Sequence, residues 1–83
     1  MKKTEPYIDK EQIKSDILHD ARVLKLNKDF ALVISKSALQ ALDKWLEKHE
    51  TFTQIDITKV ISREIKKYNK DLAFLYHNRD KII

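Results

Sequence analysis

The chain contains no glycine and no cysteine, and it has only one proline. Without glycine, tight hairpin turns become rare and glycine-rich phosphate-binding loops are excluded. Without cysteine, the chain has no disulfide, no thiolate nucleophile and no cysteine-based zinc site. A turn that needs a left-handed residue would have to use Asn27, Asn69 or Asn78, because asparagine is the next most tolerant type. These absences predict an all-α fold.

The sequence also lacks a long apolar run. No stretch approaches the roughly 20 apolar residues that span a bilayer, and Met1–Pro6 leads into charged residues rather than an apolar signal region. We therefore expect no membrane contact and a cytoplasmic location, which the absence of cysteine fits. With 83 residues, of which 42% are hydrophobic, the composition predicts a single domain over 1–83. Residues 1–8 would form a lead-in segment before the first helix, and part of this segment need not be ordered.

Patterns that carry catalysis or metal binding are missing as well. His19, His49 and His77 are scattered, and no two have the i, i+4 spacing of a helical zinc site. For His19 we expect a local surface pair with Asp16 or Asp20. The serines have no glycine-built elbow that would expose a nucleophile, and the carboxylates mostly neighbour lysines. We therefore expect a protein that is not an enzyme, with no catalytic residue, no metal and no cofactor.

Capping residues predict where the first helix begins. Asp9 is followed three residues later by Gln12, which is the pattern of a reciprocal capping box, and Ile8 and Ile13 have the spacing of a hydrophobic staple. The first helix is therefore expected from about Lys10 to Leu24. Its periodic apolar face comprises Ile13, Ile17, Leu18, Ala21 and Leu24.

The second helix has two candidate starting points. Asn27 is a good N-cap and predicts a helix that begins directly after it. Ser35, with Ile34 before it and Leu39 after it, also forms a cap and staple, which would leave 24–34 extended. We favour the continuous helix, because helical spacing persists across about five turns. The apolar positions are Phe30, Val33, Ile34, Ala38, Ala41, Leu42, Trp45 and Leu46.

The remaining helices follow from two further polar caps. Thr53 followed by Asp56 repeats the capping pattern and predicts a third helix from about Gln54 to Tyr68. Asn69 is the expected break, and a short fourth helix should run from Lys70 to about Arg79. Short connections favour neighbouring helices that pack side by side. The predicted fold is a compact all-α bundle of three main helices plus a short C-terminal fourth helix.

The net charge of +4 is concentrated near the end of the chain. Residues 1–56 carry equal numbers of basic and acidic side chains, whereas residues 57–83 carry seven basic and three acidic ones. Five of the basic residues have the spacing that places side chains on one side of a helix, over an arc of roughly 100°: Lys59, Arg63, Lys66, Lys67 and Lys70. Glu64 should lie toward the apolar flank. We interpret this basic set, assisted by Arg79 and Lys81, as contacts to a nucleic-acid phosphate backbone. A solvated surface and an acidic protein partner are the alternatives.

The aromatic residues separate into two groups. Phe30 and Trp45 fall within the apolar periodicity and are expected in the core rather than as stacking platforms for bases. Phe74 lies off the apolar face of the fourth helix, and Tyr7 precedes the first helix. These two are the aromatics expected to be exposed or to form a dimer contact. The small size of the core and the wide apolar surface of the second helix are compatible with a homodimer.

Three segments together resemble the ATP-cone, the small regulatory domain of ribonucleotide reductases and their transcriptional repressor. These are Pro6–Ile13, Thr53–Ile61 and Asp71–Tyr76. The resemblance implies a helical scaffold and a nucleotide-sensing role, with a pocket near the start of the first helix. The family grips phosphates partly through an N-terminal hairpin reading Val-x-Lys-Arg-Asp-Gly, and only Lys2 and Lys3 precede Pro6 here. ATP is therefore expected as a ligand only if the resemblance extends to function.

Two other segments resemble families that work with DNA. The run from Phe30 to Asn69 is loosely similar to the SWIB domain of chromatin-associated proteins. Phe52–Ile57 is similar to the last loop and helix of a histone fold, although the second helix here would be about two turns too short. The leading hypothesis is a small non-catalytic regulatory module that binds nucleic acid. The alternatives are a nucleotide-sensing domain of ATP-cone type and an inhibitory or protein-interaction module that docks on an acidic surface.

Overall fold

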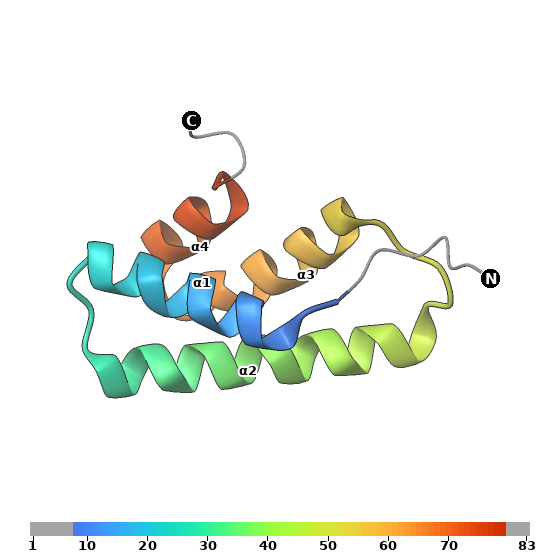
Figure 1. Ribbon diagram of the computed structural model, residues 1–83, viewed down its shortest axis with the longest axis horizontal. Coiled ribbons are helices and arrows are strands. Elements are labelled where there is room, and N and C mark those ends of the chain that lie inside the picture. The colour runs from blue at the N-terminus through green and yellow to red at the C-terminus, as the bar shows by residue number, and fades with distance from the viewer. Residues whose placement is uncertain (1–7, 80–83) are drawn as a thin grey trace.

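A computed structural model describes residues 8–79, which form four helices and, within that range, no strand. The helices are α1 (Lys10–Val23), α2 (Lys28–Lys48), α3 (Gln54–Lys66) and α4 (Lys70–His77). Figure 1 shows the long α2 along one edge of the molecule, with the other three helices on the same side of it. Each helix packs against two others, in the closed order α1, α2, α3, α4 and back to α1. The predicted bundle of three main helices and a short fourth is confirmed.

The helix starts follow the capping chemistry, with one difference at α1. Thr53 and Asp56 form a complete capping box, in which each side chain accepts a hydrogen bond from the other's backbone N–H, at 3.2 and 2.9 Å. Asp9 caps α1 by accepting from the Gln12 N–H at 3.1 Å. The Gln12 side chain does not return to the cap, however, because its amide donates to Asp16 at 2.8 Å. The box predicted at Asp9 is therefore only half formed.

The second helix is continuous from its first candidate start. The Asn27 side chain accepts hydrogen bonds from the N–H groups of Asp29 and Phe30, at 2.8 and 3.1 Å. Ser35, the alternative cap, lies buried within α2 and donates to the Leu32 carbonyl at 2.9 Å. The alternative start near residue 36 is therefore wrong.

The left-handed turn residue is a lysine, not an asparagine. Lys25 has φ of 61° and is the only positive-φ residue between residues 8 and 79. It follows the C-cap of α1 in a Schellman motif, in which the Lys25 N–H bonds the Arg22 carbonyl and the Leu26 N–H bonds the Ala21 carbonyl, both at 2.9 Å. Asn27 could not serve this turn because it already caps α2 with φ of −59°.

The third helix ends earlier than predicted. Its last turn tightens, because the N–H groups of Lys67 and Tyr68 bond carbonyls three residues back, at 3.1 and 2.9 Å. The helix therefore ends at Lys66, and Asn69 caps α4 by accepting from the Leu72 N–H at 2.9 Å. The chain turns sharply over residues 67–69.

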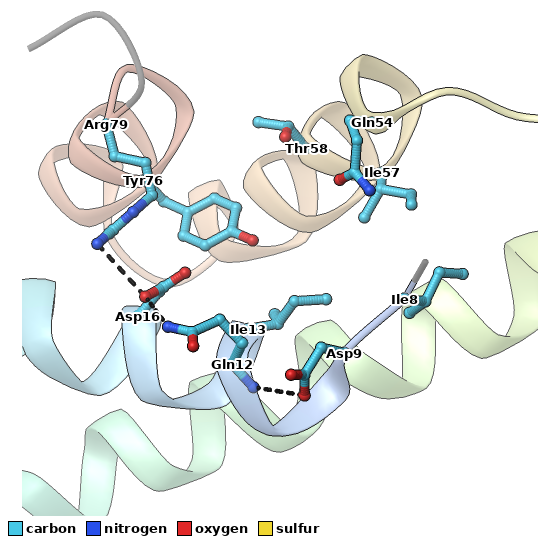
Figure 2. A pocket seen from close by; sticks show the side chains of 10 residues that line it. All are labelled: Ile8, Asp9, Gln12, Ile13, Asp16, Gln54, Ile57, Thr58, Tyr76 and Arg79. Carbon is cyan, nitrogen blue, oxygen red and sulfur yellow. Dashed lines mark hydrogen bonds and ion pairs between the residues drawn. The ribbon is translucent and has the colours of Figure 1, made fainter. Parts of the chain in front are cut away.

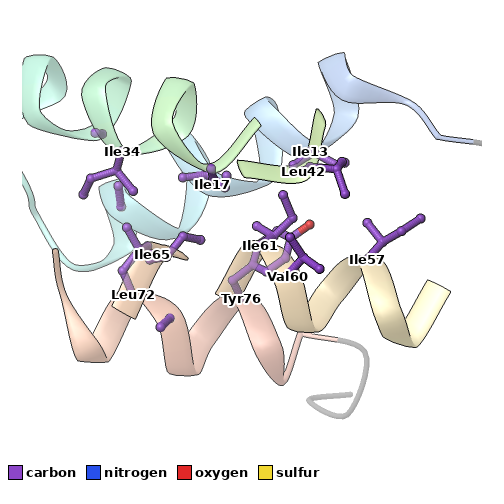
Figure 3. Packing of buried hydrophobic residues seen from close by; sticks show 14 residues of the cluster. Ile13, Ile17, Ile34, Leu42, Ile57, Val60, Ile61, Ile65, Leu72 and Tyr76 are labelled. Atoms are coloured by element: carbon purple, nitrogen blue, oxygen red, sulfur yellow. The ribbon is translucent and has the colours of Figure 1, made fainter. Parts of the chain in front are cut away.

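The core lies between all four helices (Figure 3). Its buried apolar residues are Ile13, Ile17, Ala21, Ala31, Ile34, Ala38, Leu42, Ile57, Val60, Ile61, Ile65, Leu72, Ala73 and Tyr76. Two residues that the apolar periodicity placed in the core are instead exposed: Phe30 and Val33. Val33 lies on the side of α2 away from its buried residues, and Phe30 lies at the edge of the buried face. The rings of Phe30 and Tyr68 contact each other edge to face, 6.3 Å apart.

Trp45 packs against the edge of the core, as predicted. Its ring stacks on His49 with centroids 3.9 Å apart and meets Phe52 edge to face. This aromatic group joins the end of α2 to the loop before α3. Among the described residues, no helix is both long enough and apolar enough to cross a membrane.

Candidate functional site

The basic residues that the sequence placed on one helix side are divided between two helices. Lys59, Arg63 and Lys66 lie on α3, whereas Lys70 is the first residue of α4. All four are exposed. Because the chain turns between the two helices, Lys70 faces the α3 residues across a groove instead of continuing their row. The predicted single stripe is thus wrong in its geometry, although these residues do gather.

The groove between α3 and α4 has a volume of about 390 Å³. It is lined by Ser62, Arg63, Lys66, Lys70, Ala73, Phe74, His77 and Asn78. The lining residues of α3 are spaced i, i+1, i+4, and those of α4 from Lys70 to His77 are spaced i, i+3, i+4, i+7. Each set therefore lies on one side of its helix. Two of the lining residues, Ser62 and Ala73, are small and buried. The Ser62 hydroxyl lies 3.4 Å from Nδ1 of His77, which connects the two walls.

The groove is positively charged. Arg63, Lys66 and Lys70 line it, and none of its described lining residues is acidic. Within residues 8–79, none of these three side chains takes part in an ion pair, and neither does Lys59 on the adjoining face of α3. Four neighbouring cations that have no ion-pair partner among these residues create a local positive potential, which attracts anions.

Lys67 does not belong to this group, because it is paired with Glu64. Its Nζ lies 3.0 Å from the Glu64 carboxylate, which also accepts a hydrogen bond from Ser37 at 2.8 Å. Partial burial raises the pKa of Glu64, but the hydrogen bonds from Ser37 and Lys67 and the charges of Lys67 and Lys44 together lower it below its ordinary value. Glu64 does lie toward the interior, as predicted, but it takes one lysine out of the basic set.

Arg79 is also paired, with two carboxylates of α1. Its guanidinium bonds Asp20 at 2.6 Å and lies 3.4 Å from Asp16, so that it joins the end of α4 to α1. Asp20 is buried and pairs with Arg79 rather than forming the surface pair expected with His19. Lys81 and Tyr7, like the rest of the lead-in over residues 1–7, lie outside the described residues.

A second pocket, of about 240 Å³, lies at the start of α1, where the nucleotide-sensing alternative requires one. Figure 2 shows Asp9, Gln12 and Asp16 of the α1 segment facing Gln54 and Thr58 of α3 and the Tyr76 ring of α4. Among its described lining residues, the only cation is Arg79, which already bonds two carboxylates. The charge of this pocket therefore disfavours a nucleotide triphosphate.

Phe74 is the groove residue whose role the sequence left open. Its side chain is 65% exposed, which agrees with its predicted position off the apolar face. The sequence did not reveal that it stands beside the basic residues. The spacing of Lys70, Ala73, Phe74 and His77 holds the missing signal, because i, i+3, i+4, i+7 places all four on one helix face.

Comparisons with protein-family models, curated proteins and solved structures gave no match. The resemblances to the ATP-cone, the SWIB domain and the histone fold therefore stay predictions. Within residues 8–79, no group of three or more His, Asp or Glu side chains could hold a metal ion. The function must be inferred from the shape and charge of the site itself.

Proposed function

We propose that this protein is a small non-catalytic regulatory module that binds the phosphate backbone of nucleic acid. Four exposed side chains would make the contacts: Lys59, Arg63, Lys66 and Lys70. The observation that supports this function most strongly is a concentration of cations around one groove whose described lining is free of carboxylates. Within residues 8–79 these cations form no ion pair. Basic side chains in such an arrangement neutralise phosphates and release their counterions, which is the main source of sequence-independent affinity.

Recognition by this surface would be weakly sequence-specific. Base edges are read mainly by Asn, Gln or bidentate Arg side chains. Asn78 is the only amide in the described lining, and its Nδ2 already donates to the Phe74 carbonyl at 2.9 Å. Charge would therefore supply most of the binding free energy.

A salt titration with matched charge variants tests the proposal. The site variant, Arg63→Gln/Lys66→Gln/Lys70→Gln, removes three cations from the groove. The control variant, Lys28→Gln/Lys36→Gln/Lys48→Gln, removes three exposed cations of α2. Its net charge therefore equals that of the site variant. Binding of a labelled oligonucleotide is followed by fluorescence anisotropy over a range of salt concentrations.

We expect the wild-type affinity to fall as salt rises, and the magnitude of the slope of log K against log salt to decrease by about two to three in the site variant. The control variant should retain a slope close to that of the wild type. Equal losses in the two variants, or no binding at low salt, would contradict the proposal. Tighter binding of polyglutamate than of the oligonucleotide would assign the same surface to an acidic protein partner.

The nucleotide-sensing alternative has a separate test. A ligand that binds only the folded state raises the melting temperature. Because the pocket at the start of α1 is lined by carboxylates and offers no free cation among the described residues, we expect ATP to leave the melting temperature unchanged. A rise with ATP that disappears in Thr58→Glu, a variant that narrows this pocket and repels phosphate, would favour the ATP-cone role instead.

A further inference from the structure

The groove between α3 and α4 combines its basic rim with an exposed aromatic wall. Phe74 is more exposed than either Phe30 or Tyr68, and within residues 8–79 its ring has no aromatic partner. The ring therefore offers a free π-face beside the basic side chains that line the same groove.

The floor of the groove leaves space beside this ring. Ser62 and Ala73 are both small and buried, and larger side chains at these positions would close the hollow next to Phe74. The resulting volume of about 390 Å³ lies within the range of sites that hold small organic groups, about 300–1,000 Å³. The space therefore suits a planar group that lies against the ring.

We propose that this groove binds single-stranded nucleic acid, with one base stacked on Phe74 and the neighbouring phosphates held by Arg63, Lys66 and Lys70. This inference rests on the proposed function, because it names the kind of nucleic acid that the same site would take. Stacking platforms beside basic side chains are the usual means of binding single strands, since every base presents a π-face.

A duplex fits the same surface poorly. Its base faces are already stacked on one another, and direct reading of its grooves needs an element that projects into them. Here the cations and the aromatic ring both line a hollow. A single strand can turn a base into the hollow while its backbone follows the basic rim.

The test compares a single-stranded oligomer of about 12 nucleotides with its duplex, at one low salt concentration, by fluorescence anisotropy. Phe74→Leu removes the stacking surface while it keeps an apolar side chain. Phe74→Trp keeps a stacking surface. Ile55→Leu is the matched control, because Ile55 is 66% exposed, lies on α3 and does not line the groove. Since both sites are exposed, circular dichroism should show all three variants folded.

We expect the single strand to bind at least about fivefold more tightly than the duplex, and Phe74→Leu to lose at least about fivefold for the single strand alone. Phe74→Trp and Ile55→Leu should bind like the wild type. The inference would be overturned if the single strand and the duplex bound with equal affinity, and if this affinity depended on the basic residues but not on Phe74. The proposed function would then still hold. No binding of either form would overturn both. A dimer that Phe74→Leu dissociates in sedimentation velocity, with nucleic-acid binding unchanged, would identify the ring as a self-association contact and overturn the inference.

Discussion

Lys25 occupies a backbone position that helix ends usually give to glycine. The left-handed conformation costs a residue with a Cβ about 1–2 kcal/mol, and glycine's greater freedom in the unfolded chain offsets part of that difference. We expect Lys25→Gly to raise the free energy of unfolding by about 0.5–1 kcal/mol. At this chain length the melting temperature should rise by about 2–8 °C.

Lys25→Ala is the control for this prediction, because alanine removes the charge but keeps the Cβ. Both variants can be measured by thermal unfolding under the same conditions. A gain in Lys25→Ala equal to that in Lys25→Gly would show that the lysine side chain, and not the backbone conformation, is responsible.

Glu64 gives the protein a pH-dependent contribution to stability. Its folded-state pKa lies below the ordinary value of 4.5, so as the pH falls the unfolded chain takes up the proton first. The contribution is therefore fully present above about pH 4.5 and is lost as the pH falls through the folded-state pKa. We expect Glu64→Gln to be less stable than the wild type at pH 7, with a difference that shrinks toward pH 3. Urea unfolding of both proteins across this range measures the difference, and a constant gap at every pH would contradict the assignment.

At the scale of the helices, the ion pair between Arg79 and Asp20 holds α4 against α1. The Asp20 side chain is 10% exposed, so removal of Arg79 would leave a nearly buried carboxylate without its partner. We expect Arg79→Met to lower the free energy of unfolding by about 2–3 kcal/mol, somewhat less than for a fully buried pair because Arg79 itself is partly exposed. The midpoint of urea unfolding gives this value.

The double variant Arg79→Met/Asp20→Asn separates the charge from the packing. Asparagine leaves no unpaired charge, so the double variant should recover part of the stability that Arg79→Met loses. If it is instead less stable than the single variant, the contribution of Arg79 is packing of its aliphatic stem rather than neutralisation of Asp20.

The helices differ in how far local sequence determines them. Thr53 and Asn27 bond backbone groups two or three residues away, so their helix starts could be predicted from the sequence alone. The tightened turn after Lys66 had no comparable signal. Arg79 and Asp20 are 59 residues apart, so their pairing depends on the finished bundle, and the assignment of Arg79 to a phosphate contact missed it.

At the scale of the whole molecule, charge is distributed unevenly between two sites. The groove between α3 and α4 is basic, whereas the described lining of the pocket at the start of α1 includes Asp9, Asp16 and the paired Arg79. The sequence revealed the surplus of cations in residues 57–83 but not their division between two walls, because that division depends on the turn over 67–69. A polyanion near the molecule would be drawn to the groove and repelled from the pocket, so its approach would be oriented.

The tether formed by Arg79 also affects what a ligand of the groove must do. An eight-residue helix such as α4 is too short to persist by itself in water. Its attachment to α1 and α3 keeps Lys70 and Phe74 in place before any ligand arrives. A single-stranded nucleic acid that enters the groove would therefore bind side chains that are already in position. Little of the binding free energy would be lost in ordering the protein.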